Sequence, residues 1–457
     1  MILVRTLLIT CAVVCLWLLS GCNTRFSETG APAPYGSTAP EGARPATGGK
    51  PAPTAPLAPK VRTLPELRSE PLIRVFLAQA TVVSLTLQIP AQLPDGRTVA
   101  AGQHQVQAIR AGLVLDGTPI PAECPLEQPA AEVRFSTEVD PPFGKPKRLT
   151  LSGLPVLRLQ GSQVQLLEEV SLETYLAGVL GMEMTPTWPV EALKSQAIAA
   201  RSYAAAKYLE RFDRPWQLHW HFTVDMSYGG TGAKRTPGVE KALRETRGQI
   251  LTYRGSPLPA LFHACSGGST ESAANLWPKL MGGDRSTPMA AQMPVVVDGD
   301  ADAGCSGLGL RKTHWRWKAN FPLSGVTRDL QAYARANPAD KLLFGPVSGV
   351  EIVSRHPDSG RVAQIAINHK LDGRNRRTLM PAQDFRMAID PGACRSTWWD
   401  SCTIASAKGG VLVLSGRGFG HGVGLSQVSA WQMARSGSDA AAIVRRFYPA
   451  SVLERRW

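Results

Sequence analysis

Apolar and polar positions alternate along the first part of the chain that can fold. The segments 72–87 and 152–170 consist of short apolar and β-branched runs, interrupted by single polar residues and separated by turn residues. Apolar residues at alternate positions are typical of one face of a β-strand. The pattern therefore predicts a β-rich region over residues 71–170.

The spacing of apolar residues becomes that of a helix after Ser171. Residues 172–184 carry apolar residues at helical spacing, and residues 189–212 do the same with Ala, Leu and Ile. Pro189 suits the first turn of the second helix, where Glu191 faces the positive end of the helix dipole.

Strand-like patterns return over residues 239–262 and 347–367, and residues 439–449 predict a last short helix. Helices are thus grouped in the middle of the chain with β-rich regions around them, which predicts the α+β class. We expect residues 171–457 to carry the chemistry.

The chain begins with an export signal. One positive residue, Arg5, precedes an apolar stretch that is short for a membrane span, and the stretch ends in Leu-Ser-Gly-Cys. That ending is similar to a bacterial lipobox, so residues 1–22 are predicted to be a lipoprotein signal peptide with Cys22 as the lipidated residue. A plain cleaved signal with an incidental cysteine is the alternative. Residues 23–70 are rich in Pro, Ala and Gly, which predicts a disordered tether.

Composition describes a folded, basic, exported protein. Of the residues, 44% are hydrophobic and 19% charged, and the formal net charge is +14. A basic chain favours an acidic partner, but its Lys and Arg are scattered and no dense basic run interleaves with aromatics. Because export also separates the chain from nucleic acid, we expect no nucleic-acid partner.

Five cysteines remain after the signal peptide, in a compartment where disulfides persist. Cys394 and Cys402 are close enough in sequence to close one loop, and Cys265 with Cys305 is a second candidate bridge. The sequence alone does not fix the pairing. Cys124 would be left as a free thiol.

A glycine run near the end, residues 415–434, places glycine at every second position from 416 to 424. A dinucleotide loop needs G-x-G-x-x-G, so the period of two excludes it. Alternate residues share a strand face, and the run then predicts a strand with one bare face against which a ligand can lie. A turn near Gly422 would bring His421 and Gln427 together.

Two charged residues in the helical segment are candidates for chemistry. Glu183 stands between two methionines at the end of the first helix, where dry surroundings favour the protonated acid; an exposed or capping glutamate is the alternative. Arg201 stands among alanines and its planar fork suits a carboxylate or sugar hydroxyls, or else an ordinary salt bridge. Tyr203 is more often a core residue than a ligand in such a position.

Residues 261–277 place a Ser-Gly-Gly turn after a predicted strand. Ser266, Gly267 and Gly268 suit the presentation of backbone N–H groups to an oxygen-rich ligand. The turn is not a G-x-S-x-G nucleophile elbow, and Cys265 lacks the context of a papain-like nucleophile.

Three long motifs, at residues 172–204, 262–277 and 416–434, together resemble the SpoIID/LytB family, named for stage II sporulation protein D and an amidase enhancer of the bacterial cell wall. The similarity spans roughly residues 72–457 and implies a SpoIID-like α+β fold with an active-site cleft. It implies a peptidoglycan lytic transglycosylase that cleaves the bond between N-acetylmuramic acid and N-acetylglucosamine, preferentially in denuded glycan strands, and leaves 1,6-anhydro ends. The implied reaction needs no cofactor.

The resemblance also implies roles for single residues. Glu183 matches the catalytic acid, while substrate-binding roles fall on Arg201 and Tyr203 in the helix, on the Ser-Gly-Gly turn, and on His421, Gly422 and Gln427 of the glycine run. The motif departs from the family at Thr185, which separates Met184 from Pro186.

Some family members bind zinc downstream of the long helix. The corresponding segment here has His219 and His221 but no cysteine, so we predict no metal. A non-catalytic wall-binding protein that recruits or stimulates an N-acetylmuramoyl-L-alanine amidase is the alternative function. The expected partners are peptidoglycan glycan strands, a cell-wall amidase under that alternative, and a membrane reached through the lipid anchor. The expected location is the cell envelope, at the outer membrane in a Gram-negative cell.

Overall fold

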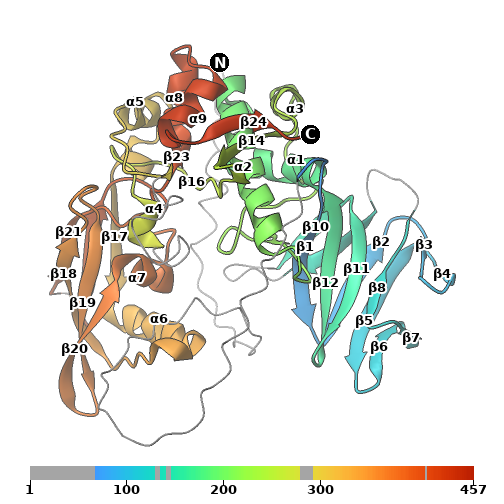
Figure 1. Ribbon diagram of the computed structural model, residues 1–457. Coiled ribbons are helices and arrows are strands. Elements are labelled where there is room, and N and C mark those ends of the chain that lie inside the picture. The colour runs from blue at the N-terminus through green and yellow to red at the C-terminus, as the bar shows by residue number, and fades with distance from the viewer. Residues whose placement is uncertain (1–66, 129–133, 140–145, 278–291, 407–408) are drawn as a thin grey trace, which may run out of the picture.

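Two sheets build the β-rich region at the start of the fold, and Figure 1 shows them in blue and cyan on the right. The structure is a computed structural model that describes residues 67–128, 134–139, 146–277, 292–406 and 409–457. One sheet has the strand order β13-β1-β12-β11-β8, and the other has the order β10-β9-β2-β5-β6-β7.

The strands of the first sheet are β1 (Leu72–Ala80), β8 (Glu123–Pro125), β11 (Leu154–Gln160), β12 (Gln163–Ser171) and β13 (Leu218–His219). Those of the second are β2 (Val82–Leu87), β5 (Gly102–Ile109), β6 (Gly112–Leu115), β7 (Thr118–Ile120), β9 (Phe135–Val139) and β10 (Lys147–Leu151). A small hairpin joins β3 (Ala91–Gln92) and β4 (Thr98–Val99). In β5, Val106 and Ala108 are buried while their neighbours in sequence are exposed, so one face of the strand packs inward.

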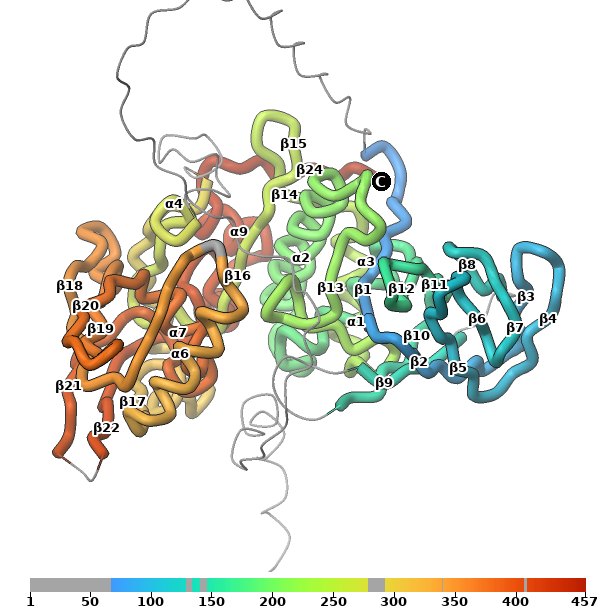
Figure 2. Tube along the Cα trace, turned by 90° about the horizontal axis from the view of Figure 1, so that it is seen from below, coloured from blue at the N-terminus to red at the C-terminus, as the bar shows by residue number. Residues whose placement is uncertain are grey.

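Helices form the middle of the molecule, between the β-rich region and a third part on the left of Figure 1; Figure 2 shows the same succession from below. The central helices are α1 (Leu172–Glu183), α2 (Val190–Glu210), α3 (Pro237–Glu245), α8 (Gln427–Arg435) and α9 (Ala440–Phe447). Helix α2 contacts each of the others and buries most of its alanines, because small side chains let neighbouring helices approach closely.

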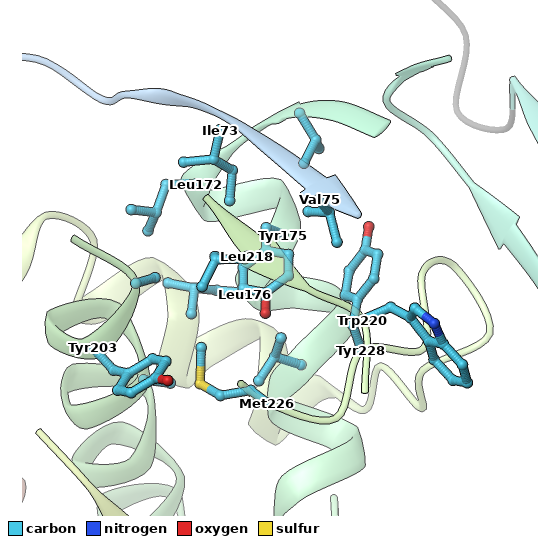
Figure 3. Packing of buried hydrophobic residues seen from close by; sticks show 14 of the residues in the cluster. Ile73, Val75, Leu172, Tyr175, Leu176, Tyr203, Leu218, Trp220, Met226 and Tyr228 are labelled. Carbon is cyan, nitrogen blue, oxygen red and sulfur yellow. The ribbon is translucent and has the colours of Figure 1, made fainter. Parts of the chain in front are cut away.

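The largest core extends from the β-rich region into these helices. Figure 3 shows part of it, where Val75 of β1 and Leu218 of β13 lie against Tyr175 of α1. Short strands complete this part: β14 (Gln249–Tyr253), β15 (Ser256–Pro257) and β24 (Val452–Arg455) form one sheet, and β16 (Phe262–His263) pairs in parallel with β23 (Leu425–Ser426).

The third part is a lobe with its own core, here called the lobe and spanning residues 317–416. It contains the sheets β17-β22-β21 and β18-β19-β20. Its elements are β17 (Trp317–Pro322), α6 (Leu323–Ala336), the 3-10 turn η3 (Pro338–Asp340), β18 (Val347–Arg355), β19 (Val362–Leu371), β20 (Arg374–Pro381), α7 (Ala382–Ile389), β21 (Trp399–Ala405) and β22 (Val411–Gly416). The short helices α4 (Ala273–Leu276) and α5 (Asp300–Gly307) and the π-helical turn η2 (Arg311–Trp315) precede it.

Most elements agree with the sequence predictions, and the fold is of the mixed α and β class. The strand predicted from residue 239 is wrong at its start, because α3 occupies Pro237–Glu245; Thr236 caps this helix and Pro237 takes its first turn. Leu67 is buried in the largest core and Glu70 accepts from the backbone N–H of Glu173, so residues 67–70 are folded rather than part of the tether. The signal peptide, Cys22 and residues 23–66 lie outside the described residues, and within the described ranges no helix is long and apolar enough to cross a membrane.

Candidate functional site

Glu183 is the last residue of α1. The helix begins after Ser171, whose hydroxyl accepts from the backbone N–H of Thr174, and Met184 leaves the helix in an extended conformation. Because Pro186 disfavours helical conformation at the residue before it, the chain turns away here and leaves the Glu183 side chain at the helix end.

The carboxyl group of Glu183 is partly buried and hydrogen-bonded on one oxygen. The backbone N–H of Ser227 donates to its Oε1 at 2.6 Å. Burial raises the pKa of Glu183 to about 7, against the opposing effect of the Ser227 hydrogen bonds. At neutral pH a substantial fraction of this carboxyl group therefore holds its proton, as a general acid requires.

The end of the glycine run meets the end of α1. Gln427, the first residue of α8, donates through Nε2 to the main-chain carbonyl of Glu183 at 3.1 Å and to Oε1 of Gln196 at 3.3 Å. Two of the residues expected at the site, more than 200 positions apart in sequence, are thus brought together. The contact is made to the backbone of Glu183, so the carboxyl group stays available for other contacts.

Arg201 does not share this location. Its side chain is completely buried and forms a two-pronged ion pair with Glu173, at 2.9 Å from Nε and 2.8 Å from Nη2. The indole N–H of Trp457 donates to the same carboxylate. Since Glu173 lies at the opposite end of α1 from Glu183, the structure corrects the expected substrate contact to a buried structural ion pair.

Tyr203 is likewise part of the interior. Its ring belongs to the largest core, and its hydroxyl donates to Oδ1 of Asp225 at 2.8 Å. Arg211 forms an ion pair with the same aspartate at 3.0 Å. The structure therefore corrects Tyr203 from a substrate-binding candidate to a buried residue that anchors Asp225.

The Ser-Gly-Gly turn is held from inside the protein. The hydroxyl of Ser266 donates to Oδ2 of Asp298 at 2.6 Å, and Ser429 donates to the same oxygen at 2.7 Å. The N–H of Gly268 points back to the Ser266 hydroxyl at 3.2 Å. Ser266 is fully buried and Gly267 is buried as well, so of this turn only Gly268 keeps partly exposed surface.

The glycine run is not the regular strand that its period predicts. Strand β22 ends at Gly416, and four of the following glycines, at 418, 420, 422 and 424, adopt positive φ between 72° and 106°. A Cβ on Gly424 would lie 2.0 Å from the carbonyl oxygen of Leu261, and one on Gly422 would lie 2.6 Å from Cζ of Arg361. The glycines are needed for left-handed backbone and for close packing against residues 261–271, rather than for a bare strand face.

His421 lies inside this packing as a neutral ring. Its Nδ1 accepts from the N–H of Val423 at 3.0 Å. Its ring packs in T-shaped geometry against Trp277 and His263, with ring centres 5.2 and 5.7 Å apart. Burial, together with the nearby guanidinium of Arg386, lowers its pKa to about 3. No described hydrogen bond links His421 to Glu183.

Arg361 is a site neighbour that the sequence analysis did not single out. It comes from the lobe, is completely buried, and donates through Nη2 to the carbonyl oxygens of Ser266 and Ser269. Its guanidinium lies over Gly422. One arginine thus ties the Ser-Gly-Gly turn to the glycine run, and an arginine that follows a glycine in a loop gives no sequence pattern by which to find it.

Of the two predicted cysteine pairs, only Cys265 and Cys305 lie close together. The Sγ atoms of Cys265 and Cys305 lie 3.5 Å apart as buried thiols. Cys394 and Cys402 contact different carbonyl oxygens, those of Ser396 and Val350, and Cys124 is a buried free thiol. In the structure both candidate disulfides are unformed, because a bonded pair requires about 2.05 Å.

Two further features are the histidines after α2 and two hollows on the surface. Over the described ranges no cluster of three or more His, Cys, Asp or Glu side chains could hold a metal ion; His219 and His221 lie next to each other, with the N–H of His221 donating to Nδ1 of His219. Two hollows of about 410 and 520 Å³ lie on the β-rich region, and neither is lined by a candidate site residue.

Comparisons with known proteins identify two regions of the chain. The family model described as stage II sporulation protein matches residues 160–253, which include α1, α2 and Glu183. A second model, described as domain of unknown function DUF8618, matches residues 306–424, which include the lobe and most of the glycine run.

Three curated relatives extend the similarity. An uncharacterized protein of Brachyspira hyodysenteriae is 30% identical over 284 residues, which are 61% of this chain and 66% of the relative. Stage II sporulation protein D of Bacillus amyloliquefaciens is 26% identical over 309 residues, covering 65% of this chain and 76% of that protein. The amidase enhancer of Bacillus subtilis is 25% identical over 297 residues, covering 61% of this chain but 40% of its own length. Residues 160–253 thus carry the SpoIID family domain, and the chain is similar to members of the SpoIID/LytB family.

Proposed function

We propose that this protein is a peptidoglycan lytic transglycosylase of the cell envelope, with Glu183 as its catalytic acid. The relatives support a role at the cell wall, since one is named for sporulation and another for enhancing an amidase. The observation that carries the proposal is the Glu183 carboxyl group, whose pKa of about 7 lets it hold a proton at neutral pH.

One carboxyl group suffices for this reaction. Ordinary glycosidases use a second carboxylate to activate water or to attack the sugar. In the proposed reaction Glu183 protonates the oxygen between N-acetylmuramic acid and N-acetylglucosamine, and the same group then accepts the proton of the C6 hydroxyl as the 1,6-anhydro ring closes. The internal hydroxyl replaces a second side chain because it is already next to the reacting carbon.

Two contacts position the proposed acid. The backbone N–H of Ser227 donates to Oε1 of the carboxyl group, and Gln427 fixes the backbone from which the side chain extends. His421 is neutral and bonded within the glycine run, so we assign it a structural role beside the site. Gly422 lies buried under the guanidinium of Arg361, and Ser266 and Gly267 are buried, so of these predicted substrate contacts only that of Gly268 stays part of the proposal.

The amidase enhancer relative favours a second candidate, a non-catalytic protein that binds the wall and stimulates an amidase. The two candidates differ in whether the purified protein alone changes glycan strands. Purified glycan strands, with and without stem peptides, are incubated with the protein, and the products are analysed by mass spectrometry. Anhydro-ended fragments from the protein alone support the transglycosylase, whereas binding without new ends supports the alternative.

A further inference from the structure

Three arginine–aromatic pairs gather where the lobe meets the Ser-Gly-Gly turn. The guanidinium carbon of Arg316 lies 5.9 Å from the ring centre of Trp315, that of Arg395 lies 5.0 Å from Phe419, and that of Arg417 lies 4.9 Å from Trp398. We call these six residues the Arg–Trp surface. Each of the six side chains keeps part of its surface open to solvent.

The Arg–Trp surface lies directly on the Ser-Gly-Gly turn. A Cβ on Gly268 would lie 3.3 Å from the ring of Trp315, and one on Gly267 would lie 3.0 Å from Cγ of Arg417. Both glycines have positive φ, 76° at Gly267 and 116° at Gly268. The turn therefore lets an indole ring and an arginine approach its backbone as closely as packing allows.

The same surface connects to the surroundings of Glu183. Trp315 and Phe419 pack against a small buried cluster that includes Val428, and Trp188 packs against this cluster too. Trp188 follows Glu183 by five residues, and Val428 is the neighbour of Gln427. Aromatic side chains from η2, from the glycine run and from the loop after Glu183 thus pack against the same buried cluster.

The charge of the surface is positive. Asp400 is the acceptor for both Arg316, at 2.8 Å, and Arg417, at 2.7 Å, so one carboxylate faces two guanidinium groups. Exposed Lys312 lies three residues before Trp315, and exposed Lys318 lies two residues after Arg316. Arg395 donates to the carbonyl oxygen of Thr313 in the π-helical turn η2, a rare element that often marks functional sites.

We propose that the Arg–Trp surface binds the carboxylate-bearing sugar of a glycan strand, in a subsite next to the catalytic group. An indole face offers an apolar platform to a sugar ring, and an arginine fork recognises a carboxylate with two hydrogen bonds. In peptidoglycan the sugar of this class is N-acetylmuramic acid with a free lactyl carboxylate. The identity of the strand rests on the proposed function, whereas recognition of the carboxylate rests on the Arg–Trp surface.

The first arm of the test measures binding without turnover. The full chain carrying Glu183→Gln is titrated with denuded glycan strands, and with the same strands after conversion of their carboxyl groups to methylamides. The account predicts that loss of the carboxylates weakens binding about tenfold or more, because charged hydrogen bonds are removed. Equal affinity for both strands overturns the inference.

The second arm assigns the effect to the surface. Arg316→Gln is suited to this, because its side chain is 53% exposed and the change leaves Arg417 paired with Asp400. It is expected to weaken binding of acidic strands about tenfold with little effect on methylamide strands. The matched control is Arg376→Gln on the exposed strand β20, which makes the same charge change elsewhere and is expected to bind like the parent.

Further outcomes separate the inference from a general charge effect and from the proposed function. Equal losses in Arg316→Gln and Arg376→Gln, or equal losses of Arg316→Gln on both strands, overturn it. Arg417→Lys keeps the charge but loses the fork, and is expected to lose affinity for acidic strands while its thermal midpoint stays that of the parent. If the wild type makes no anhydro ends but carboxylate-dependent binding persists, the proposed function fails and the subsite stands.

Discussion

The side-chain amide of Gln427 donates to the main-chain carbonyl of Glu183 at 3.1 Å, which fastens the start of α8 to the end of α1. We expect Gln427→Ala to lower the rate of glycan cleavage about tenfold while lowering the free energy of unfolding by only about 1 kcal/mol, the usual worth of one hydrogen bond. Rates and urea unfolding are measured together. The matched control is Gln432→Ala on the same helix; a similar rate loss in both variants argues against a specific link.

The buried pair of Arg201 and Glu173 is expected to serve stability rather than catalysis. Arg201→Met leaves the Glu173 carboxylate without its main partner, which should lower the free energy of unfolding by about 3–5 kcal/mol. The double variant with Glu173→Gln should recover part of this loss, as urea unfolding will show. A folded, equally stable Arg201→Met protein that has lost its activity would restore the substrate role predicted from the sequence.

The pH dependence of cleavage follows from the raised pKa of Glu183. Its proton is lost as the pH rises through about 7, so the rate should fall over the same range in a pH–rate profile. The same proton makes the free energy of unfolding fall as the pH rises. The folded protein holds this proton up to about pH 7 and the unfolded chain only to about its usual pKa of 4.5, so this contribution is complete below pH 4.5 and lost as the pH rises through 7. A rate that rises from pH 6 to pH 8 contradicts the assignment.

Gly424 tests the role of the glycine run. A Cβ there meets the carbonyl oxygen of Leu261 at 2.0 Å, and φ is +72°. Gly424→Ala should therefore destabilise the protein by more than the roughly 1–2 kcal/mol that left-handed backbone alone costs. Gly437→Ala is the matched control, since φ there is +93° and a Cβ meets nothing within 4 Å. Equal unfolding midpoints for the two variants would show that the close contact has no effect.

Helices α1, α2 and α9 lie where the sequence predicts them. Helix α3 was missed although its buried residues Val239, Ala242 and Leu243 stand at helical spacing, because the segment was assigned together with the strand that follows it. The separate core of the lobe was also missed, since an apolar pattern shows that a strand is buried without showing which strands share a core.

The candidate site was predicted in part. Glu183 and Gln427 lie together, whereas Arg201 and Tyr203 do not join them. The alanines around Arg201 in fact reveal close packing, and a buried arginine then requires a carboxylate that the sequence places 28 positions earlier. In the glycine run, every second residue is glycine because alternate positions from 418 to 424 adopt positive φ. The sequence pattern alone does not distinguish this cause from a strand with one bare face.

The most direct measurement of the central claim compares Glu183→Gln with Glu351→Gln, a variant of an exposed carboxylate on β18, in the digestion of denuded glycan strands. Mass spectrometry counts the 1,6-anhydro ends formed per unit time. The account predicts wild-type numbers for Glu351→Gln and a loss of at least about a hundredfold for Glu183→Gln, because the proton donor is removed. Undiminished anhydro ends from a folded Glu183→Gln protein would contradict it.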